Sequence, residues 1–310
     1  MTFSILLYLA VAVFIVGNLV RIVRIVRMPV HVRWELYPVP HEPASKFSHG
    51  GSYMEDSEWW SKPLASNKLG ELAIMLPEIF LLKGVWERNR SLWLWSWLMH
   101  WGLYLMAGTI ILLLIGSVGR LTGMISADMK INGFGSALSW VIRLVSWLAV
   151  IAGTLGSAGV LLLRLFSRKL RPFASVATIF NVTLILALFD SGMIALLQNP
   201  DAIRQIFDLT VSLVTFHRVS LPGGVLATHV IILAFFLIYF PFTHMTHMYM
   251  KYFTYHSVRW DDQPLEKGGY KERNVENSLH YPVSWSAPHI RGDGRKKWVD
   301  VVSEEGRKSD

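Results

Sequence analysis

Residues 224–250 read GVLATHVIILAFFLIYFPFTHMTHMYM, and this stretch decides the class of the fold. It contains no Asp, Glu, Lys or Arg. A helix that crosses a bilayer core of about 30 Å needs about 20 predominantly apolar residues, because each residue adds about 1.5 Å. The stretch is therefore predicted to cross a membrane as one helix.

Four other apolar stretches are long enough to cross a membrane, at residues 2–20, 92–118, 140–163 and 173–198. The composition of the 310 residues agrees, since 52% are hydrophobic and 17% are charged, against about 25% charged in soluble domains. We expect an all-α integral membrane protein built as a five-transmembrane-helix bundle. An aromatic belt at the membrane surface is the interpretation of Trp93, Trp95, Trp97 and Trp101.

The positions of the basic residues predict how the helices are oriented. Ten Lys and Arg residues lie at positions 21–90, four at 164–171 and eleven from residue 251 onward, whereas the other two loops hold two each. Cytoplasmic loops carry the excess of Lys and Arg, so the N-terminus is expected outside and the C-terminus in the cytoplasm. The formal charge of +8 is thereby explained by orientation, and no nucleic-acid partner is expected. Because basic residues follow the first stretch and none precedes it, we interpret it as a retained anchor rather than a signal peptide.

The spans divide the chain into four parts. These are a first transmembrane helix at 1–27, a cytoplasmic loop at 28–91, a four-helix membrane core at 92–250 and a cytoplasmic tail at 251–310. Within the loop, residues 69–86 mix apolar and charged side chains, which predicts an amphipathic helix in the membrane interface with a kink at Pro77. The tail is polar and has no periodicity that would build its own core, so we expect it to dock onto a partner.

Ionisable residues inside the predicted spans are functional candidates, because a charge in the bilayer is costly. They are Arg143, Asp190, His100, His229, His244 and His247. The chain has no Cys, which excludes disulfides, a self-ligated iron–sulfur cluster and covalently attached c-type haem. Any metal chemistry must therefore use His, Met or carboxylate ligands.

The spacing of histidines in the fifth span suits two stacked cofactors. His229 and His247 are 18 residues apart, which is five full turns at about 100° per residue, so they are expected on one helix face about 27 Å apart. His100 lies in the inner half of the second span, at the depth of His244 or His247. Two His residues facing each other across a bundle core can hold a b-type haem. The alternative is that these His residues only hydrogen-bond neighbouring helices.

The same residues resemble the gamma subunit of respiratory nitrate reductase, a five-span membrane cytochrome b with two haems. The resemblance rests on His229, Phe240-Pro241-Phe242-Thr243 and His247 in the fifth span, and on Leu98-Met99-His100-Trp101-Gly102 in the second. The long loop and the extended tail are more similar to relatives in sulfate reducers. Those relatives pair with a cytoplasmic iron–sulfur subunit of the heterodisulfide-reductase type.

The resemblance implies a set of haem ligands. His100 and His247 would ligate an inner haem b, with His244 ranked second to His247, and His229 would ligate an outer haem b. The family places a second His ten residues after the first in the second span, where this chain has Ile110. Candidates for the missing ligand are His217, Met106 and Met193. We expect two b haems rather than one, and an absent or five-coordinate outer haem is the alternative.

The resemblance also implies a function, that of the membrane cytochrome b subunit of a quinone-linked oxidoreductase complex of anaerobic respiration. Its place would be a bacterial or archaeal cytoplasmic membrane. Menaquinone would exchange electrons with the outer haem, with Asp190 or His217 as proton acceptor, and an ion pair between Asp190 and Arg143 is the structural alternative. The expected partners are a cytoplasmic iron–sulfur subunit and the lipid bilayer. Further membrane or periplasmic cytochrome subunits are left open as additional partners. A proton-coupled transporter and a haem-free membrane anchor are the competing functions.

Overall fold

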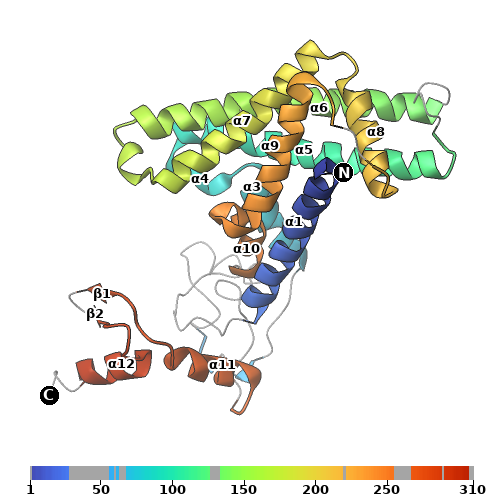
Figure 1. The fold of residues 1–310 in the computed structure, drawn as a ribbon. Coiled ribbons are helices and arrows are strands. Elements are labelled where there is room, and N and C mark those ends of the chain that lie inside the picture. Colours follow the sequence, from blue (N-terminus) through green and yellow to red (C-terminus); the bar gives the residue numbers. More distant parts are fainter. Residues whose placement is uncertain are drawn as a thin grey trace. The chain divides into compact units, whose positions relative to one another are not determined.

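The computed structural model describes residues 2–27, 56–58, 61–62, 68–125, 133–218, 221–254, 267–287 and 290–306. Its longest elements are the helices α1 (Thr2–Val26), α5 (Arg90–Leu121), α6 (Gly133–Phe166), α7 (Val176–Gln198) and α9 (Gly224–Tyr239) (Figure 1). Each of the five contains an apolar segment long enough to cross a membrane. The prediction of a helical membrane protein with five spans is confirmed.

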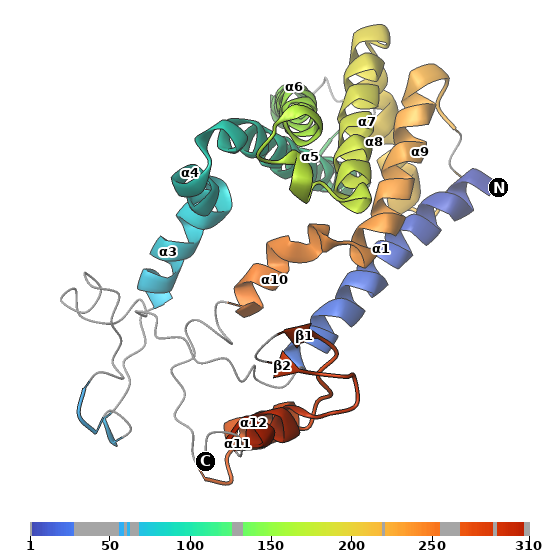
Figure 2. The same cartoon turned by 90° about the vertical axis from the view of Figure 1, so that its left-hand side faces the viewer.

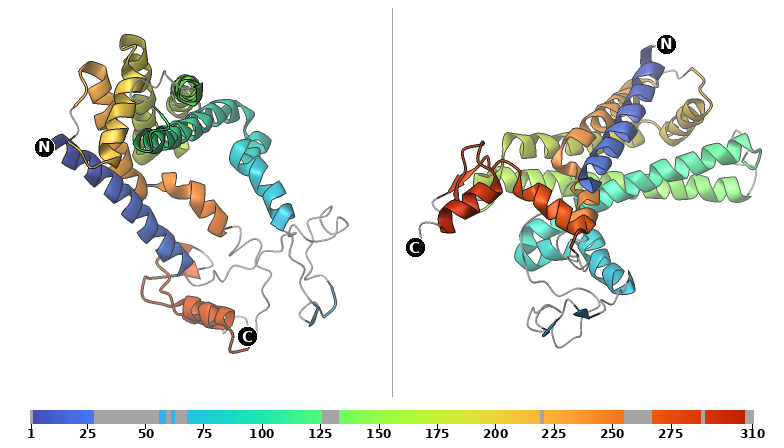
Figure 3. Two further views of the ribbon diagram at one scale, coloured as in Figure 1. Left: turned by 90° about the vertical axis from the view of Figure 1, so that its right-hand side faces the viewer. Right: turned by 90° about the horizontal axis from the view of Figure 1, so that it is seen from below.

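The chain divides into two compact units, and the first comprises Met1–Asn18 and Leu76–Met245. In this unit α5 packs along α6, and α7 packs against both α6 and α9 (Figures 2 and 3). Glycines allow the closest approach, since a Cβ at Gly156 would collide with the backbone of Met99 and a Cβ at Gly102 would collide with that of Gly153. Small residues at these positions therefore let the backbones of α5 and α6 touch, as is common in membrane bundles.

The loop between the fourth and fifth spans holds a further helix, α8 (Ala202–Val214), which we did not predict. Its Phe207 is fully buried, and a Cβ at Gly116 of α5 would lie 2.8 Å from the Phe207 ring. Next to this contact, Nη1 of Arg120 lies 2.5 Å from Oδ1 of Asp208. Helix α8 is therefore fixed to α5 by an apolar contact and an ion pair.

The fifth span is shorter than expected, and the prediction of one helix through residue 250 is wrong. Helix α9 ends at Tyr239 and is followed by two 3₁₀ turns, η4 (Phe240–Phe242) and η5 (His244–Thr246), and then by α10 (His247–Thr254). Thr243 between the turns is extended, with φ −114° and ψ 172°. Pro241 has no backbone N–H and cannot continue an α-helix, which explains the break. Counting helical turns therefore does not place His229 and His247 on one face.

The predicted amphipathic segment at 69–86 forms two shorter helices, α3 (Lys68–Phe80) and α4 (Lys83–Arg88). The break between them falls at Leu82, whose φ of 49° lies in the left-handed region, and not at Pro77, which lies within α3. Leu69 and Leu72 of α3 are exposed. An exposed apolar side is what a helix in the membrane interface requires.

The C-terminal end of α3 is held by aromatic side chains of α5. The indole N–H groups of Trp97 and Trp101 both donate to the carbonyl oxygen of Phe80, each over 3.1 Å. The hydroxyl of Tyr104 donates to the carbonyl oxygen of Ile79 over 3.0 Å. The last carbonyls of a helix have no donor within the helix, so these bonds satisfy groups that would otherwise need water. The tryptophan cluster thus positions α3, a role that the aromatic-belt interpretation did not include.

The second unit comprises Leu19–Met75 and Thr246–Asp310. Its C-terminal part contains α11 (Tyr270–Leu279), the antiparallel strands β1 (Ser286–Ala287) and β2 (Ile290–Arg291), and α12 (Trp298–Gly306). Val283 and Val301 are buried, and the ring centroids of Trp285 and Trp298 lie 6.0 Å apart. The expectation that the tail builds no core is therefore wrong, because a small one forms around Val283.

Candidate functional site

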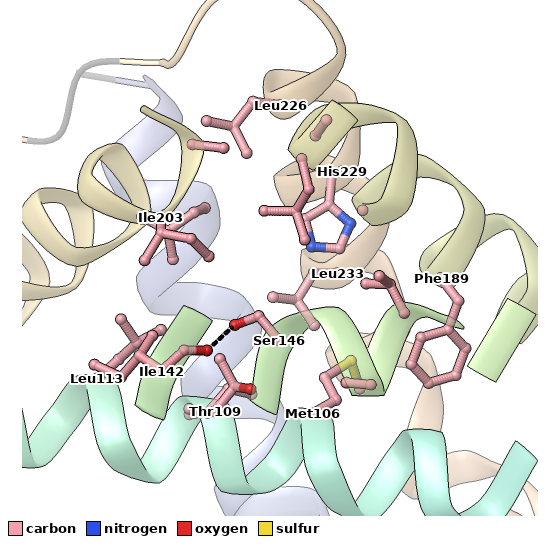
Figure 4. Close-up of a pocket in the computed structure, with 18 residues that line it drawn as sticks. Met106, Thr109, Leu113, Ile142, Ser146, Phe189, Ile203, Leu226, His229 and Leu233 are labelled. Atoms are coloured by element: carbon pink, nitrogen blue, oxygen red, sulfur yellow. Dashed lines mark hydrogen bonds between the residues drawn. The ribbon is translucent and has the colours of Figure 1, made fainter. Parts of the chain in front are cut away.

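A cavity of about 110 Å³ lies among helices α5, α6, α7, α8 and α9 of the first unit (Figure 4). Its wall is apolar except for Thr109, Ser146 and His229. Both hydroxyls donate hydrogen bonds within their own helices. Ser146 donates to the carbonyl oxygen of Ile142 over 2.7 Å, and Thr109 donates to that of Leu105 over 3.0 Å. His229 is therefore the lining residue that can offer a nitrogen to a ligand.

The imidazole of His229 is held through its Nδ1 atom. Nδ1 lies 3.1 Å from the carbonyl oxygen of Leu188 and 3.2 Å from Oγ of Ser191, both on α7. Because a carbonyl oxygen can only accept, the proton of the neutral ring is on Nδ1 and the lone pair is on Nε2. The ring rests on Gly192, where a Cβ would lie 3.0 Å from Cε1. Hydrogen bonds of this kind fix the tautomer and the orientation of histidines that bind metals.

Two further residues of interest line the same cavity. One is Ile110, where the resemblance led us to expect a second His, and the other is Met106, one helical turn before it on α5. In Figure 4 the imidazole of His229 projects into the cavity from α9, and Met106 enters from α5 on the other side. The structure thus brings His229, Ile110 and Met106 together, and Met106 supplies a thioether sulfur.

The other two candidates for the missing ligand lie elsewhere. Met193 is on α7 but does not line the cavity. His217 is exposed after α8, and its Nδ1 lies 2.8 Å from Oγ1 of Thr215. Of the three candidates for the second outer ligand, Met106 is the one that shares a cavity with His229.

Asp190 and Arg143 do not form an ion pair, which was the alternative to a role for Asp190 as proton acceptor. Among the described residues no salt bridge joins them, and the side chain of Arg143 is exposed. Asp190 is half-buried on α7 and is not part of the cavity wall. The carboxylate therefore lies on a spanning helix, apart from both Arg143 and the cavity of His229.

His100 on α5 repeats the arrangement of His229. Its Nδ1 lies 2.7 Å from the carbonyl oxygen of Ser96, one turn earlier on the same helix, so this nitrogen carries the proton. The side chain is half-buried, and its ring centroid lies 6.3 Å from that of Tyr104. Its expected partner His247 is the first residue of α10, has an exposed side chain and belongs to the second unit.

A polar chain that we did not predict joins α7 to the residues after α9. The hydroxyl of Tyr239 donates to Oδ1 of Asn181 over 2.9 Å, and Nδ2 of Asn181 lies 3.2 Å from Nδ1 of His244. With the amide in this orientation, Nδ1 of His244 accepts a hydrogen bond, which is the reverse of Nδ1 in His229 and His100. The signal in the sequence was Asn181 itself, a buried amide in an apolar span.

His229 and Met106 are side chains of the kinds that ligate haem iron. An imidazole whose Nδ1 is hydrogen-bonded to a carbonyl oxygen can bind a metal through Nε2, and haem iron is known to take one His and one Met thioether as its two ligands. The cavity of about 110 Å³ is smaller than the roughly 300–1,000 Å³ of most ligand sites, so a porphyrin requires lining side chains to move. Within the described ranges, no group of three or more His, Asp or Glu side chains gathers as a site for a bare metal ion.

Comparison of the chain with protein-family models, with curated proteins and with solved structures finds no match.

Proposed function

We propose that this chain is the membrane cytochrome b subunit of a respiratory redox complex. It transfers electrons between a menaquinone pool and a cytoplasmic iron–sulfur partner through b-type haem. The observation that carries the proposal is a feature shared by His100 and His229. These two residues lie on different spanning helices, and Nδ1 of each imidazole is hydrogen-bonded to a backbone carbonyl oxygen. Histidines that bind a metal through Nε2 need this tautomer, and His100 and His229 both have it on spanning helices.

The proposed ligand assignment has two sources. The resemblance gives His100 and His247 as ligands of an inner haem, and the shared cavity gives Met106 as the second ligand that would hold an outer haem with His229. When bound, haem would supply one-electron chemistry, and Met106 as a ligand in place of a second His would raise the reduction potential of that haem. The chain's own contribution at the outer site is an apolar wall that excludes water and a fixed imidazole. The carbonyl of Leu188 holds the Nδ1 proton, so that Nε2 stays unprotonated.

Quinol oxidation also releases protons, and Asp190 and His217 are the proposed acceptors. Neither lines the cavity of His229, so neither is assigned a part in holding haem. If Asp190 accepts a proton, Asp190→Asn slows quinol-dependent haem reduction while leaving the haem content unchanged. An unaltered rate in this variant removes Asp190 from the mechanism, and His217→Gln tests the other acceptor in the same way.

The remaining parts of the proposal concern partners and place. A multi-pass membrane protein is supported by the five apolar helices. We propose a bacterial or archaeal cytoplasmic membrane, with the loop at 28–91 and the tail at 251–310 facing the cytoplasm and docking the iron–sulfur subunit. The small core around Val283 supports this docking role, because a folded tail presents a defined surface.

Ligand variants test the proposal. The full chain is expressed with haem supplied, and b haem per polypeptide is measured for the wild type, His100→Ala, His229→Ala and His217→Ala. We expect His100→Ala and His229→Ala each to lose one haem. His217→Ala should lose none, since the His217 side chain is exposed and hydrogen-bonded to Thr215. Equal haem content in the wild type and His229→Ala contradicts the role of His229, and a haem-free wild type overturns the function.

A further inference from the structure

A polar groove of about 280 Å³ lies in the second unit, between the end of α1 and α11. Its lining residues are Arg27, Asn274, Asn277, His280 and Tyr281. Arg27 directly follows α1, and the other four occur along α11 and just beyond its end. Steps of three and four residues place them on one side of that helix.

The groove is rich in hydrogen-bond donors, and none of the described residues that line it is a carboxylate. Arg27 contributes a permanently charged guanidinium, the two Asn residues contribute amides and Tyr281 contributes a hydroxyl. His280 directs Nδ1 to the carbonyl of Glu276 over 2.7 Å, which leaves Nε2 on the other side of the ring. The lining therefore suits an anionic oxygen ligand.

One donor in the groove is left unsatisfied by the protein. Nδ2 of Asn274 is buried and has no hydrogen-bond partner within the described part of the chain. A buried amide without an acceptor destabilises the fold, and buried polar groups in native proteins are nearly always paired. An oxygen ligand in the groove would supply the acceptor that Asn274 lacks.

We propose that this groove binds a phosphate group, and that the phosphate belongs to the headgroup of an anionic phospholipid. Position along the chain supports the lipid source, because Arg27 comes directly after the apolar segment Phe3–Val26. A residue at that place stands at the level of lipid headgroups when the segment spans a bilayer. Arg21 and Arg24 precede it on the same helix, and basic pockets beside spanning helices are common sites for anionic headgroups. The proposal is independent of haem binding.

Native mass spectrometry of the full chain released from detergent micelles tests the proposal, with phosphatidylglycerol as the probe. The variants are Arg27→Gln and Asn274→Leu, and the matched control is Arg24→Gln, which removes the same charge one turn earlier on α1 from a position outside the groove. Phosphatidylcholine and excess inorganic phosphate are added in separate arms. Retention of each lipid is followed over a concentration series.

We expect the wild type and Arg24→Gln to retain one phosphatidylglycerol, and the two groove variants to bind it about tenfold more weakly. Asn274→Leu also separates ligand binding from folding, because replacing an unsatisfied amide by an apolar side chain should not lower the stability of the lipid-free chain. Displacement of phosphatidylglycerol by inorganic phosphate assigns the groove to free phosphate and overturns the lipid source. Equal retention in all four proteins overturns the site.

Discussion

Nδ1 of His229 lies 3.1 Å from the carbonyl oxygen of Leu188, and this single contact sets the chemistry of the cavity. It fixes the proton of the neutral ring on Nδ1 and turns the lone pair of Nε2 toward a ligand. Ser191, whose Oγ lies 3.2 Å from the same nitrogen, adds a second acceptor from α7. The properties of the proposed outer haem site should therefore depend on α7 as much as on α9.

Filling the space beside the imidazole of His229 should abolish binding of the proposed outer haem. A Cβ at Gly192 would lie 3.0 Å from Cε1 and 3.2 Å from Nδ1 of His229, so Gly192→Val must displace the ring. We expect loss of about one b haem per chain, in line with the roughly 10–100-fold losses of affinity seen when the support of a ligand is disturbed. The control is Gly108→Val on α5, which faces open space and should keep the wild-type spectrum. Identical spectra for both variants would argue against the ring position described here.

The proposed second ligand of the outer haem, Met106, can be tested by substitution. If Met106 ligates, Met106→Leu abolishes the spectrum of a Met-ligated haem at a cost in stability below about 1.5 kcal/mol, because the side chains are similar in volume. Adding Ile110→His restores a six-coordinate haem with a lower reduction potential, since an axial Met raises it. Redox titration with electron paramagnetic resonance measures both changes. Met193→Leu is the control, and a spectral change there instead would move the assignment to Met193.

The aromatic contacts of α3 predict a non-additive pair of substitutions. Trp97 and Trp101 donate to the same carbonyl oxygen, that of Phe80, so either indole can satisfy it alone. Each single change to Phe should therefore cost little, and the double change should cost at least about 1 kcal/mol, because a carbonyl at the helix end loses both donors. Hydrogen exchange of the amides in α3 reports the local stability. Additive effects would show that the two bonds do not act on one group.

The folded tail should weaken in acid. The backbone N–H groups of Lys296 and Arg295 each donate to Oδ1 of Asp293 over 2.8 Å, and these bonds lower the pKa of Asp293. A lowered folded-state pKa gives stability that is present above the unfolded value of about 3.9 and is lost as the pH falls through the folded value. Hydrogen exchange of the segment around Val283, corrected for intrinsic rates, should therefore speed up below about pH 4.

Asp293→Asn isolates this effect. The amide oxygen of Asn can accept the same two hydrogen bonds but does not titrate. The acid sensitivity of exchange should then largely disappear while the tail stays folded. An equal acid response in both proteins would assign the sensitivity to another carboxylate.

The features that could be predicted from the sequence are local ones. Apolar length predicted the spans, and the cost of an ionisable group in a membrane singled out His100 and His229. The break after α9 also had a local signal in Pro241, but apolar residues continue on both sides of it and concealed the end of the helix. Hydropathy measures the length of an apolar run and not the continuity of its hydrogen bonds.

Contacts between distant segments could not be predicted. The chain from Tyr239 through Asn181 to His244 joins residues about sixty positions apart, and a single sequence contains no information on that pairing. The same holds for the Leu188 carbonyl that orients His229, since every residue has a carbonyl and only the fold selects one. Likewise, the presence of Met106 in the cavity depends on how α5 is rotated against α9.

The number of b haems bound per chain is the most direct test of the proposal that this protein is a membrane cytochrome b. A pyridine haemochrome assay with a reduced-minus-oxidised spectrum, on the full chain purified after expression with haem supplied, counts b haem per polypeptide. We expect a count near two, with one haem ligated by His100 and one by His229, whose proposed second ligands are His247 and Met106. A count near one that is unchanged in His229→Ala contradicts the outer site, and a count of zero contradicts the cytochrome function as a whole.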